Sequence, residues 1–393
     1  MDVATLEQFR SALEVFCGEF EDCIKTKPSR EHLRTYITGQ LGPLQRKSVE
    51  PIALEAGVPP RTLQEFLSFH RWEEKQVAKR VRELVVKRHA DPEAVAVMDE
   101  TSYSKKGGHT VGVQRQYCGE MGKTDNCVVT VHLGYAAGDF HALVDSDVYL
   151  PKSWVSDRKL RAEVGVPDEV GFRSKLDIGL DLLRRTMADG VKFKYLTADE
   201  GYGRCGAFRR EVARMGLFYV VEVPVQLTGW VVSESRSEGA ARRIDKIWKQ
   251  GGPSWETYHV KDTEKGPVVW EARASRFRPR EKRKVGDECW LVVARNVVTG
   301  EAKYFFSNLP AEATIEEILR VAFTRWRVEK CFEEAKGEIG LGHFEVRKWK
   351  ALLRHLILSA VSLLFLNEQV RQMRGEKPLV DGLPDKGRRR SAA

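Results

Sequence analysis

The stretch Ala94-Val95-Ala96-Val97-Met98-Asp99-Glu100-Thr101 decides the fold of this chain. Its first five residues are apolar and the next two are acidic, a pattern typical of a short buried strand that carries carboxylates at its end. A second run, Phe193-Lys194-Tyr195-Leu196-Thr197-Ala198, ends in the same way at Asp199 and Glu200. The sequence therefore predicts two buried strands that each end in acids.

The order of the elements around these two strands indicates the fold class. Connections among the early strands are short, which implies antiparallel pairing. The order is three antiparallel strands, helix, strand, helix, strand and eventually a long helix. It is the order of a ribonuclease-H-like α/β fold, a mixed sheet with its first and fourth strands adjacent. We predict strands at 111–117, 127–135, 141–150 and 217–223, and helices at 171–187, 208–214 and 347–373.

Two acid-tipped strands that are neighbours would bring Asp99 and Asp199 together at one edge of the sheet. Paired carboxylates supply the hard oxygen ligands that a divalent cation requires. Glu100 and Glu200 follow directly, but successive side chains of a strand point to opposite faces. We therefore predict that the two aspartates bind metal and that the two glutamates support either the metal ligands or the structure.

The segment 325–336 carries a further group of charges. It contains no Pro or Gly and is predicted to lie within a helix that begins near Thr314. One interpretation is a solvent-exposed row of weak salt bridges. The other is a row that faces the two aspartates, with one of its glutamates as a third metal ligand. The side chains that share this helix face are Arg325, Glu329, Glu333 and Lys336.

Residues 1–90 are predicted to be helical, and 52–67 has the pattern of a helix-turn-helix. Ala53 allows close helix contact, Gly57 supplies the turn, and Leu63 packs the second helix on the first. The second helix would present three side chains to the major groove of DNA: Arg61, Thr62 and Gln64. A small helical hairpin without a DNA role is the alternative.

Residues 225–310 form an insertion that this fold does not require. Strand-like runs at 257–260, 268–272, 289–294 and 303–306 predict that it is rich in β structure. Basic side chains alternate with tryptophans, including Trp270 and Trp290. Cations and aromatic rings together suit phosphate contact and base stacking. For most of these tryptophans, however, we expect a place in a β core.

Composition limits the kind of protein. The 393 residues carry a formal net charge of +9, which permits a nucleic-acid partner, although an RNA-binding protein could show the same balance. Seven cysteines without a CxxC pair argue against a disulfide framework or a zinc site. We find neither a run of about 18 apolar residues nor a signal peptide, so we expect no membrane span and a cytoplasmic location.

With these motifs in this order, the chain resembles bacterial insertion-sequence transposases of the DDE, cut-and-paste kind. That group carries the signature Tyr-x2-Arg-x3-Glu-x6-Lys on the helix after a β-strand insertion. Arg325, Glu329 and Lys336 match its spacing, whereas Ala322 stands at the tyrosine position. The spacing favours Glu329 over Glu333 as the third acid. The resemblance covers roughly residues 45–360 and includes both aspartate motifs.

The resemblance implies metal-dependent chemistry on DNA. Asp99, Asp199 and Glu329 would bind two Mg²⁺ or Mn²⁺ ions, about 3.5–4 Å apart, at the reacting phosphodiester. Element ends would be cleaved through a hairpin intermediate and their 3′-OH ends joined to target DNA, by a homodimer in the synaptic complex. Further DNA contacts are implied for Arg325, Lys336, Lys105 and Lys106 at phosphates, and for Trp326, Trp290 or Trp270 in base stacking, because Ala322 has no ring.

This interpretation divides the chain into five parts: a DNA-binding helical domain at 1–90, the first part of the catalytic core at 91–224, the insertion at 225–310, the rest of the core with the C-terminal helix at 311–375, and a basic disordered tail at 376–393. Two alternatives stay open. One is another ribonuclease-H-like nuclease. The other is a catalytically inactive DNA-binding regulator derived from a transposase.

Overall fold

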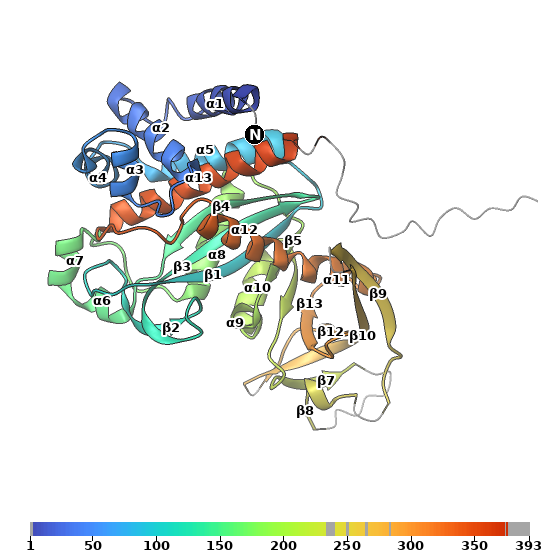
Figure 1. Ribbon diagram of the computed structural model, residues 1–393. Helices are drawn as coiled ribbons and strands as arrows, with labels where there is room; N and C mark the ends of the chain where they lie inside the picture. The colour runs from blue at the N-terminus through green and yellow to red at the C-terminus, as the bar shows by residue number, and fades with distance from the viewer. Residues whose placement is uncertain are drawn as a thin grey trace, which may run out of the picture. The chain divides into compact units, whose positions relative to one another are not determined.

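The computed structural model describes residues 3–232, 240–248, 251–263, 266–282, 284–373 and 375. The predicted tail at 376–393 lies outside the described residues. Packing separates two compact units, and most of their helices and strands are labelled in Figure 1. The first unit comprises Met1–Phe193 and Trp326–Gly375, and the second comprises Lys194–Arg325. The division of the chain into five parts, made from the sequence, is a separate matter from these two units and stays a prediction.

The sheet of the first unit is built on one long strand, β3 (Lys123–Ala137). β1 (Val95–Ser104) pairs antiparallel along one side of β3. The other side is shared by two strands, because β2 (Gln114–Cys118) pairs with the beginning of β3 and β4 (Phe140–Val148) pairs with the rest. These registers confirm the predicted antiparallel strands.

Helix α8 (Lys175–Ala188) packs on β3 and β4 in the first unit. It follows two short helices, α6 (Lys152–Ser156) and α7 (Arg158–Val164). A capping box fixes where α8 begins, since Ser174 Oγ accepts from the Asp177 N–H and the Asp177 carboxylate accepts from the Ser174 N–H. The helix predicted at 171–187 is therefore present and begins a few residues later.

The five N-terminal helices belong to the same unit, and α2, α4 and α5 pack against the C-terminal helix α13 (Trp349–Met373) (Figure 1). Helix α13 also contacts β4. The all-helical start of the chain is thus as predicted. Its helices are α1 (Val3–Gly18), α2 (Lys27–Leu41), α3 (Val49–Glu55), α4 (Pro60–Ser68) and α5 (Glu74–His89).

Helix α13 is apolar enough to stand out in the described part of the chain. By length and composition alone it could cross a membrane, with a mean hydropathy of 1.5. However, 83% of the apolar window is buried inside the protein, as in the core helix of a globular fold. We therefore treat α13 as the core helix that the N-terminal helices and β4 share.

Arg354 of α13 is fully buried and supports the end of α4. Its guanidinium donates to the carbonyl oxygens of Phe66 and Leu67, at 3.1 and 3.0 Å, in the last turn of α4. Such carbonyls have no partner within their own helix. The same group donates to His70 O at 2.7 Å and lies 4.3 Å from the centre of the Trp72 ring. Burial lowers the pKa of Arg354 to about 10.

Replacing this arginine should destabilise the first unit. We expect Arg354→Met to lower the free energy of unfolding by about 3 kcal/mol, because several buried carbonyl oxygens lose their donor. Lys350→Met on the same helix removes only an exposed ion pair to Glu73 and should cost less than about 1 kcal/mol. Urea denaturation measures both values. Equal losses for the two variants would contradict the role of Arg354.

The second unit begins with β5 (Tyr195–Ala198), which pairs in parallel with β6 (Phe218–Glu222). Pairing continues antiparallel from β6 to β13 (Ala302–Ser307), then to β12 (Cys289–Asn296) and β10 (Gly266–Glu281). The insertion is therefore rich in β structure, as predicted, and extends the sheet of this unit. Its other strands are β7 (Thr228–Val231), β8 (Arg242–Arg243), β9 (Glu256–Thr263) and β11 (Lys284–Val285).

The single helix predicted from Thr314 through residue 336 is wrong. The segment forms α11 (Ile315–Phe323) and α12 (Arg325–Gly337). Thr314 caps the start of α11 as predicted, since its hydroxyl accepts from the Glu317 N–H at 3.1 Å. At the other end the Thr324 hydroxyl donates to Arg320 O at 2.7 Å, and such side-chain bonds compete with continued helix. Two further helices of the second unit are α9 (Glu200–Gly203) and α10 (Gly206–Arg214).

Candidate active site

Helix α12 covers the face of the first unit's sheet that carries Asp99. Asp99 lies directly opposite His132 in the pairing of β1 with β3, so the two side chains share one face. The His132 ring lies 5.1 Å from the Phe332 ring of α12. It is fully buried between Thr130 Oγ1 at 2.5 Å and Ser146 Oγ at 2.7 Å. Burial lowers the pKa of His132 to about 3, so the ring beside this face is neutral.

Glu100 points to the opposite face, as its place next to Asp99 on a strand predicts. There its carboxylate accepts a hydrogen bond from Lys175 of α8 at 2.6 Å. Glu100 therefore binds a helix on the far side of the sheet from α12. Asp99 is the acid that points toward α12.

Contacts on both sides fix which way α12 is turned. Gly134 of β3 leaves room for Val328, because a Cβ atom at position 134 would lie 3.0 Å from Val328 Cγ2. One flank of α12 faces β4, where the Glu334 carboxylate lies 3.0 Å from His141 Nε2. The opposite flank must then face β1, the strand that carries Asp99.

The rotation of α12 about its own axis distinguishes Glu329 from Glu333 as the candidate metal ligand. The buried side of the helix consists of Val328, Cys331, Phe332 and Ala335. At about 100° per residue, Glu329 lies about 110° from the centre of that side and Glu333 about 150°. Both are exposed, and both are on the flank away from Glu334. Glu329 is thus the one turned more toward the sheet.

Lys336 lies on the same flank as Glu329, two turns further along α12. Its ammonium is half-buried and lies 5.6 Å from the centre of the Tyr103 ring of β1. Burial lowers the pKa of Lys336, and the negative charges that oppose this shift include Asp99. The first unit therefore brings Asp99 and Lys336 within electrostatic reach of each other.

Asp199 begins a helix in the second unit. It directly follows β5, and its Oδ1 accepts from the N–H groups of Gly201 at 2.9 Å and Tyr202 at 3.3 Å. Asp199 is therefore the N-cap of α9, an arrangement that holds the carboxylate at the end of its strand. The strand with an acid at its end is as predicted.

Sequence analysis missed Glu222, an acid at the end of the neighbouring strand β6. Burial raises its pKa, and the cations of Lys303 and Arg325, both 3.7 Å away, oppose the shift. Asp199 and Glu200 add negative charge to its surroundings. Arg325 thus lies at the same group of strand-end acids as Asp199. The only sequence signal for Glu222 was its place at the end of a predicted strand.

Comparison with known proteins identifies the family. Over residues 19–281, the chain matches the family described as DDE superfamily endonuclease. The chain belongs to this family. The matched range contains Asp99 and Asp199, whereas Glu329 lies after it. The predicted resemblance is confirmed at the level of this family.

This DDE-superfamily chain is also similar to a curated protein. A protein of Microchaete diplosiphon, named as the probable transposase for insertion sequence element IS701, is 28% identical to it over 214 residues. The alignment covers 54% of this chain and 53% of the relative. The chain therefore spans about half the length of the curated relative it matches.

Asp99, Asp199 and Glu329 carry carboxylate oxygens, the type of ligand that Mg²⁺ prefers. Asp99 and Glu329 belong to the first unit of this DDE-superfamily chain and Asp199 belongs to the second. Among the residues that the structure describes, no three His, Cys, Asp or Glu side chains form a group that could hold a metal ion. The assignment of the three acids as ligands stays a prediction.

In this DDE-superfamily chain, the segment predicted to be a helix-turn-helix forms the two helices α3 and α4 with a turn between them. Gly57 turns the chain between α3 and α4 with a φ of +66°, and Ala53 and Leu63 are buried. The predicted DNA-contacting residues lie in the first half of α4. Arg61 and Gln64 are exposed and Thr62 is half-buried, while Arg61 binds Glu65 at 2.7 Å.

The tryptophans predicted to stack on bases differ in exposure. Trp270 is buried, with its ring 4.8 Å from that of Phe323, so it belongs to the β core expected for most of them. Trp290 is half-buried and its indole N–H donates to Pro310 O at 3.0 Å. Trp326 is half-buried at the start of α12. Trp290 and Trp326 keep part of their surface available.

The contact of α12 with β3 can be tested by adding one methyl group. Gly134→Ala should lower the free energy of unfolding by about 1–3 kcal/mol, because its Cβ crowds Val328. In combination with Val328→Ala, we expect part of this loss, about 1 kcal/mol, to be recovered.

The matched control is Gly171→Ala. No atom lies within 4 Å of the added Cβ at position 171, so this change should cost little and be additive with Val328→Ala. Chemical denaturation of the single and double variants measures the coupling. Strict additivity of Gly134→Ala with Val328→Ala would show that α12 does not lie on β3 in this way.

Proposed function

We propose that this DDE endonuclease is a transposase that binds the ends of an insertion sequence, cleaves them and joins their 3′-OH ends to target DNA. The observation that carries the proposal is the placement of Asp99 opposite the flank of α12 that bears Glu329 and Lys336. The name of the similar protein from Microchaete diplosiphon supports the same class of reaction.

The proposed metal ligands are Asp99, Glu329 and Asp199. When two Mg²⁺ or Mn²⁺ ions are bound there, they supply activation of the attacking water or 3′-OH and stabilisation of the leaving 3′ oxygen. The protein's own contribution is to hold the carboxylates. β1 fixes Asp99, the N-cap of α9 fixes Asp199, and packing of α12 on β3 fixes Glu329. Glu100 stays bound to Lys175 and takes no part in the chemistry.

The cations beside these acids suit the phosphates of the substrate. Arg325 can bind two oxygens of one phosphate through its planar guanidinium. Its ion pair with Glu222 holds the guanidinium near the strand end that carries Asp199. Lys336 would place a half-buried ammonium near the phosphate held at Asp99. Trp326 and Trp290 stay candidates for stacking on an unpaired base, since Ala322 is buried and has no ring.

End recognition is assigned to the helix-turn-helix. Helix α4 would enter the major groove with Arg61, Thr62 and Gln64, while the net charge of +9 strengthens binding to double-stranded DNA. Synapsis of two ends implies a homodimer on DNA. A protein with this substrate would act in the cytoplasm, where bacterial DNA is located.

Replacing Asp99 tests the carboxylate assignment. On a duplex that carries the inverted repeat flanking the gene, with Mg²⁺, Asp99→Asn should slow cleavage at least about a hundredfold while DNA affinity is kept. Glu100→Gln changes the neighbouring acid on the other face and should keep most of the cleavage rate. Gel assays of nicking and of binding measure both properties. Robust cleavage by Asp99→Asn would rule out the proposed metal site.

A second pair of variants decides between the glutamates of α12. Glu329→Gln should abolish cleavage to a similar extent, since it removes a proposed metal ligand. Glu333→Gln alters an exposed side chain turned further from the sheet and should stay within about threefold of the unmodified protein. The same nicking assay applies. The reverse ranking would assign the third ligand to Glu333.

A further inference from the structure

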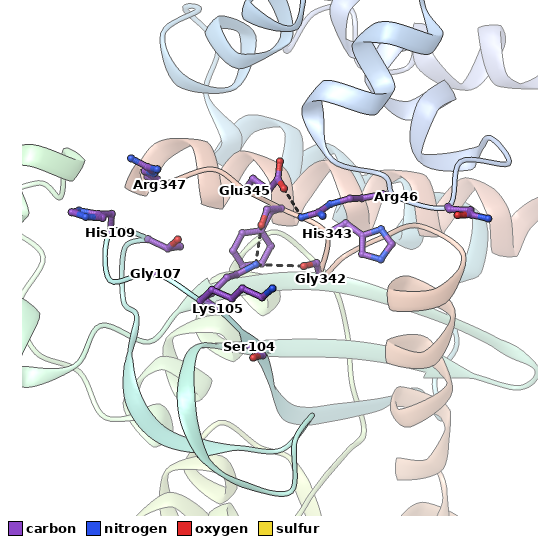
Figure 2. A pocket seen from close by; sticks show the side chains of 13 residues that line it. Arg46, Ser104, Lys105, Gly107, His109, Gly342, His343, Glu345 and Arg347 are labelled. Atoms are coloured by element: carbon purple, nitrogen blue, oxygen red, sulfur yellow. Dashed lines mark hydrogen bonds and ion pairs between the residues drawn. The ribbon is translucent and has the colours of Figure 1, made fainter.

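A cavity of about 670 Å³ lies in the first unit, beyond the end of β1 (Figure 2). Its walls come from three segments far apart in the sequence. They are residues 45–46 before α3, residues 104–107 and 109–110 at and after the end of β1, and residues 342–345 and 347 between α12 and α13. The cavity therefore joins the approach to the helix-turn-helix, the strand that carries Asp99 and the segment that follows the Glu329 helix.

Cationic side chains outnumber anionic ones in the lining of this cavity. Two histidines, His109 and His343, add further nitrogen atoms, and the one carboxylate in the lining belongs to Glu345. That carboxylate forms an ion pair with Arg46 (Figure 2). It marks a position at which an anion binds the Arg46 guanidinium. The four cationic side chains in the lining are Arg46, Lys105, Lys106 and Arg347.

Lys105 forms the floor of the cavity. Its ammonium donates to Phe344 O at 2.8 Å and lies 3.5 Å from the centre of the Phe344 ring. Burial lowers the pKa of Lys105 to about 8. Through these contacts with Phe344, Lys105 joins the loop after β1 to the segment before α13. Lys106 and Arg347 are exposed at the cavity and can reach a ligand.

We propose that this cavity binds the DNA backbone about six base pairs from the phosphate that is cleaved. The inference rests on the proposed transposase function. Lys105 follows Asp99 by six residues, or about 20 Å of extended strand. At 3.4 Å of helix rise per base pair, about 20 Å corresponds to about six base pairs. The cavity thus connects the recognition helices with the strand on which cleavage takes place.

The dimensions suit a passing strand better than a free anion. About 670 Å³ is within the range that holds a ligand of drug size, far more than one phosphate group fills. The segment 104–110 leaves Ser104, Lys106 and His109 exposed, so a polymer can enter and leave along it. Arg46 and Arg347 belong to different segments and would contact phosphates of the same strand.

The salt dependence of DNA binding tests the proposal. The probe is a 40-base-pair duplex that contains the inverted repeat flanking the gene. The variant Lys106→Gln/Arg347→Gln removes two phosphate contacts, so the slope of log affinity against log salt should fall by about 1.8. The control Arg184→Gln/Lys192→Gln removes the same charge from exposed positions in and just after α8, outside both the cavity and the predicted DNA-binding domain, and its slope should stay near that of the unmodified protein.

A scan with single neutral methylphosphonates locates the contact. Replacing phosphates about six base pairs from the cleavage position should weaken binding by the unmodified protein about tenfold and leave the cavity variant unaffected. An unchanged salt slope and an unchanged scan in the cavity variant, with binding and cleavage by the unmodified protein intact, would overturn this inference alone. Failure of the unmodified protein to bind or cleave the duplex would overturn the proposed function as well.

Competition with inorganic phosphate tests whether the cavity binds free phosphate ions instead of the phosphates of DNA. If the cavity binds the DNA backbone, millimolar phosphate should compete only weakly with the duplex. Sulfate at the same concentration should then compete to the same extent. Tight and selective binding of inorganic phosphate, lost in the Lys106→Gln/Arg347→Gln variant without any change in its DNA salt slope, would assign the cavity to free phosphate and overturn the proposal.

Discussion

The packing of α12 on β3 is the contact on which the candidate site of the first unit depends. Gly134 admits Val328, and the neutral His132 ring rests against Phe332. These two contacts set the distance of the helix from the sheet and its rotation about its own axis. The rotation places the charged flank of α12 over the strand that bears Asp99. A bulkier residue at 134 or a charged ring at 132 would disturb that placement before any charged residue changed. Asp99 and Glu329, two of the proposed metal ligands, are thus aligned by apolar contacts beneath them.

The opposite face of the same sheet is held in a different way. Asp145 of β4 is buried and binds Arg82 of α5 at 3.1 Å, while Arg185 of α8 donates to the same carboxylate at 2.7 Å. Buried charges are stable only when they are paired in this manner. The ion pairs fasten α5 and α8 to the face away from α12. One face of the sheet therefore binds the supporting helices, and the other face carries Asp99 and the candidate active site.

Much of this arrangement could be predicted from sequence, because apolar runs and helical periodicity report burial directly. The acid-ended strands and the β-rich insertion were found in that way. The end of α11 was not, since the bond of the Thr324 hydroxyl to a backbone carbonyl leaves the apolar period unchanged. Glu222 was missed because it comes near Asp199 only through the pairing of β5 with β6. Arg354 was missed because its partners are carbonyl groups more than 280 residues away along the chain.

The support that Arg354 gives to α4 has a consequence for synthesis of the protein. The ribosome completes α3 and α4 more than 280 residues before it adds Arg354, the side chain that satisfies the end of α4. A nascent or prematurely terminated chain would expose the apolar surface that α13 normally covers. A stable α4 should therefore arise only in chains that have passed Arg354, so shorter fragments would lack the ordered form of the helix proposed to contact DNA.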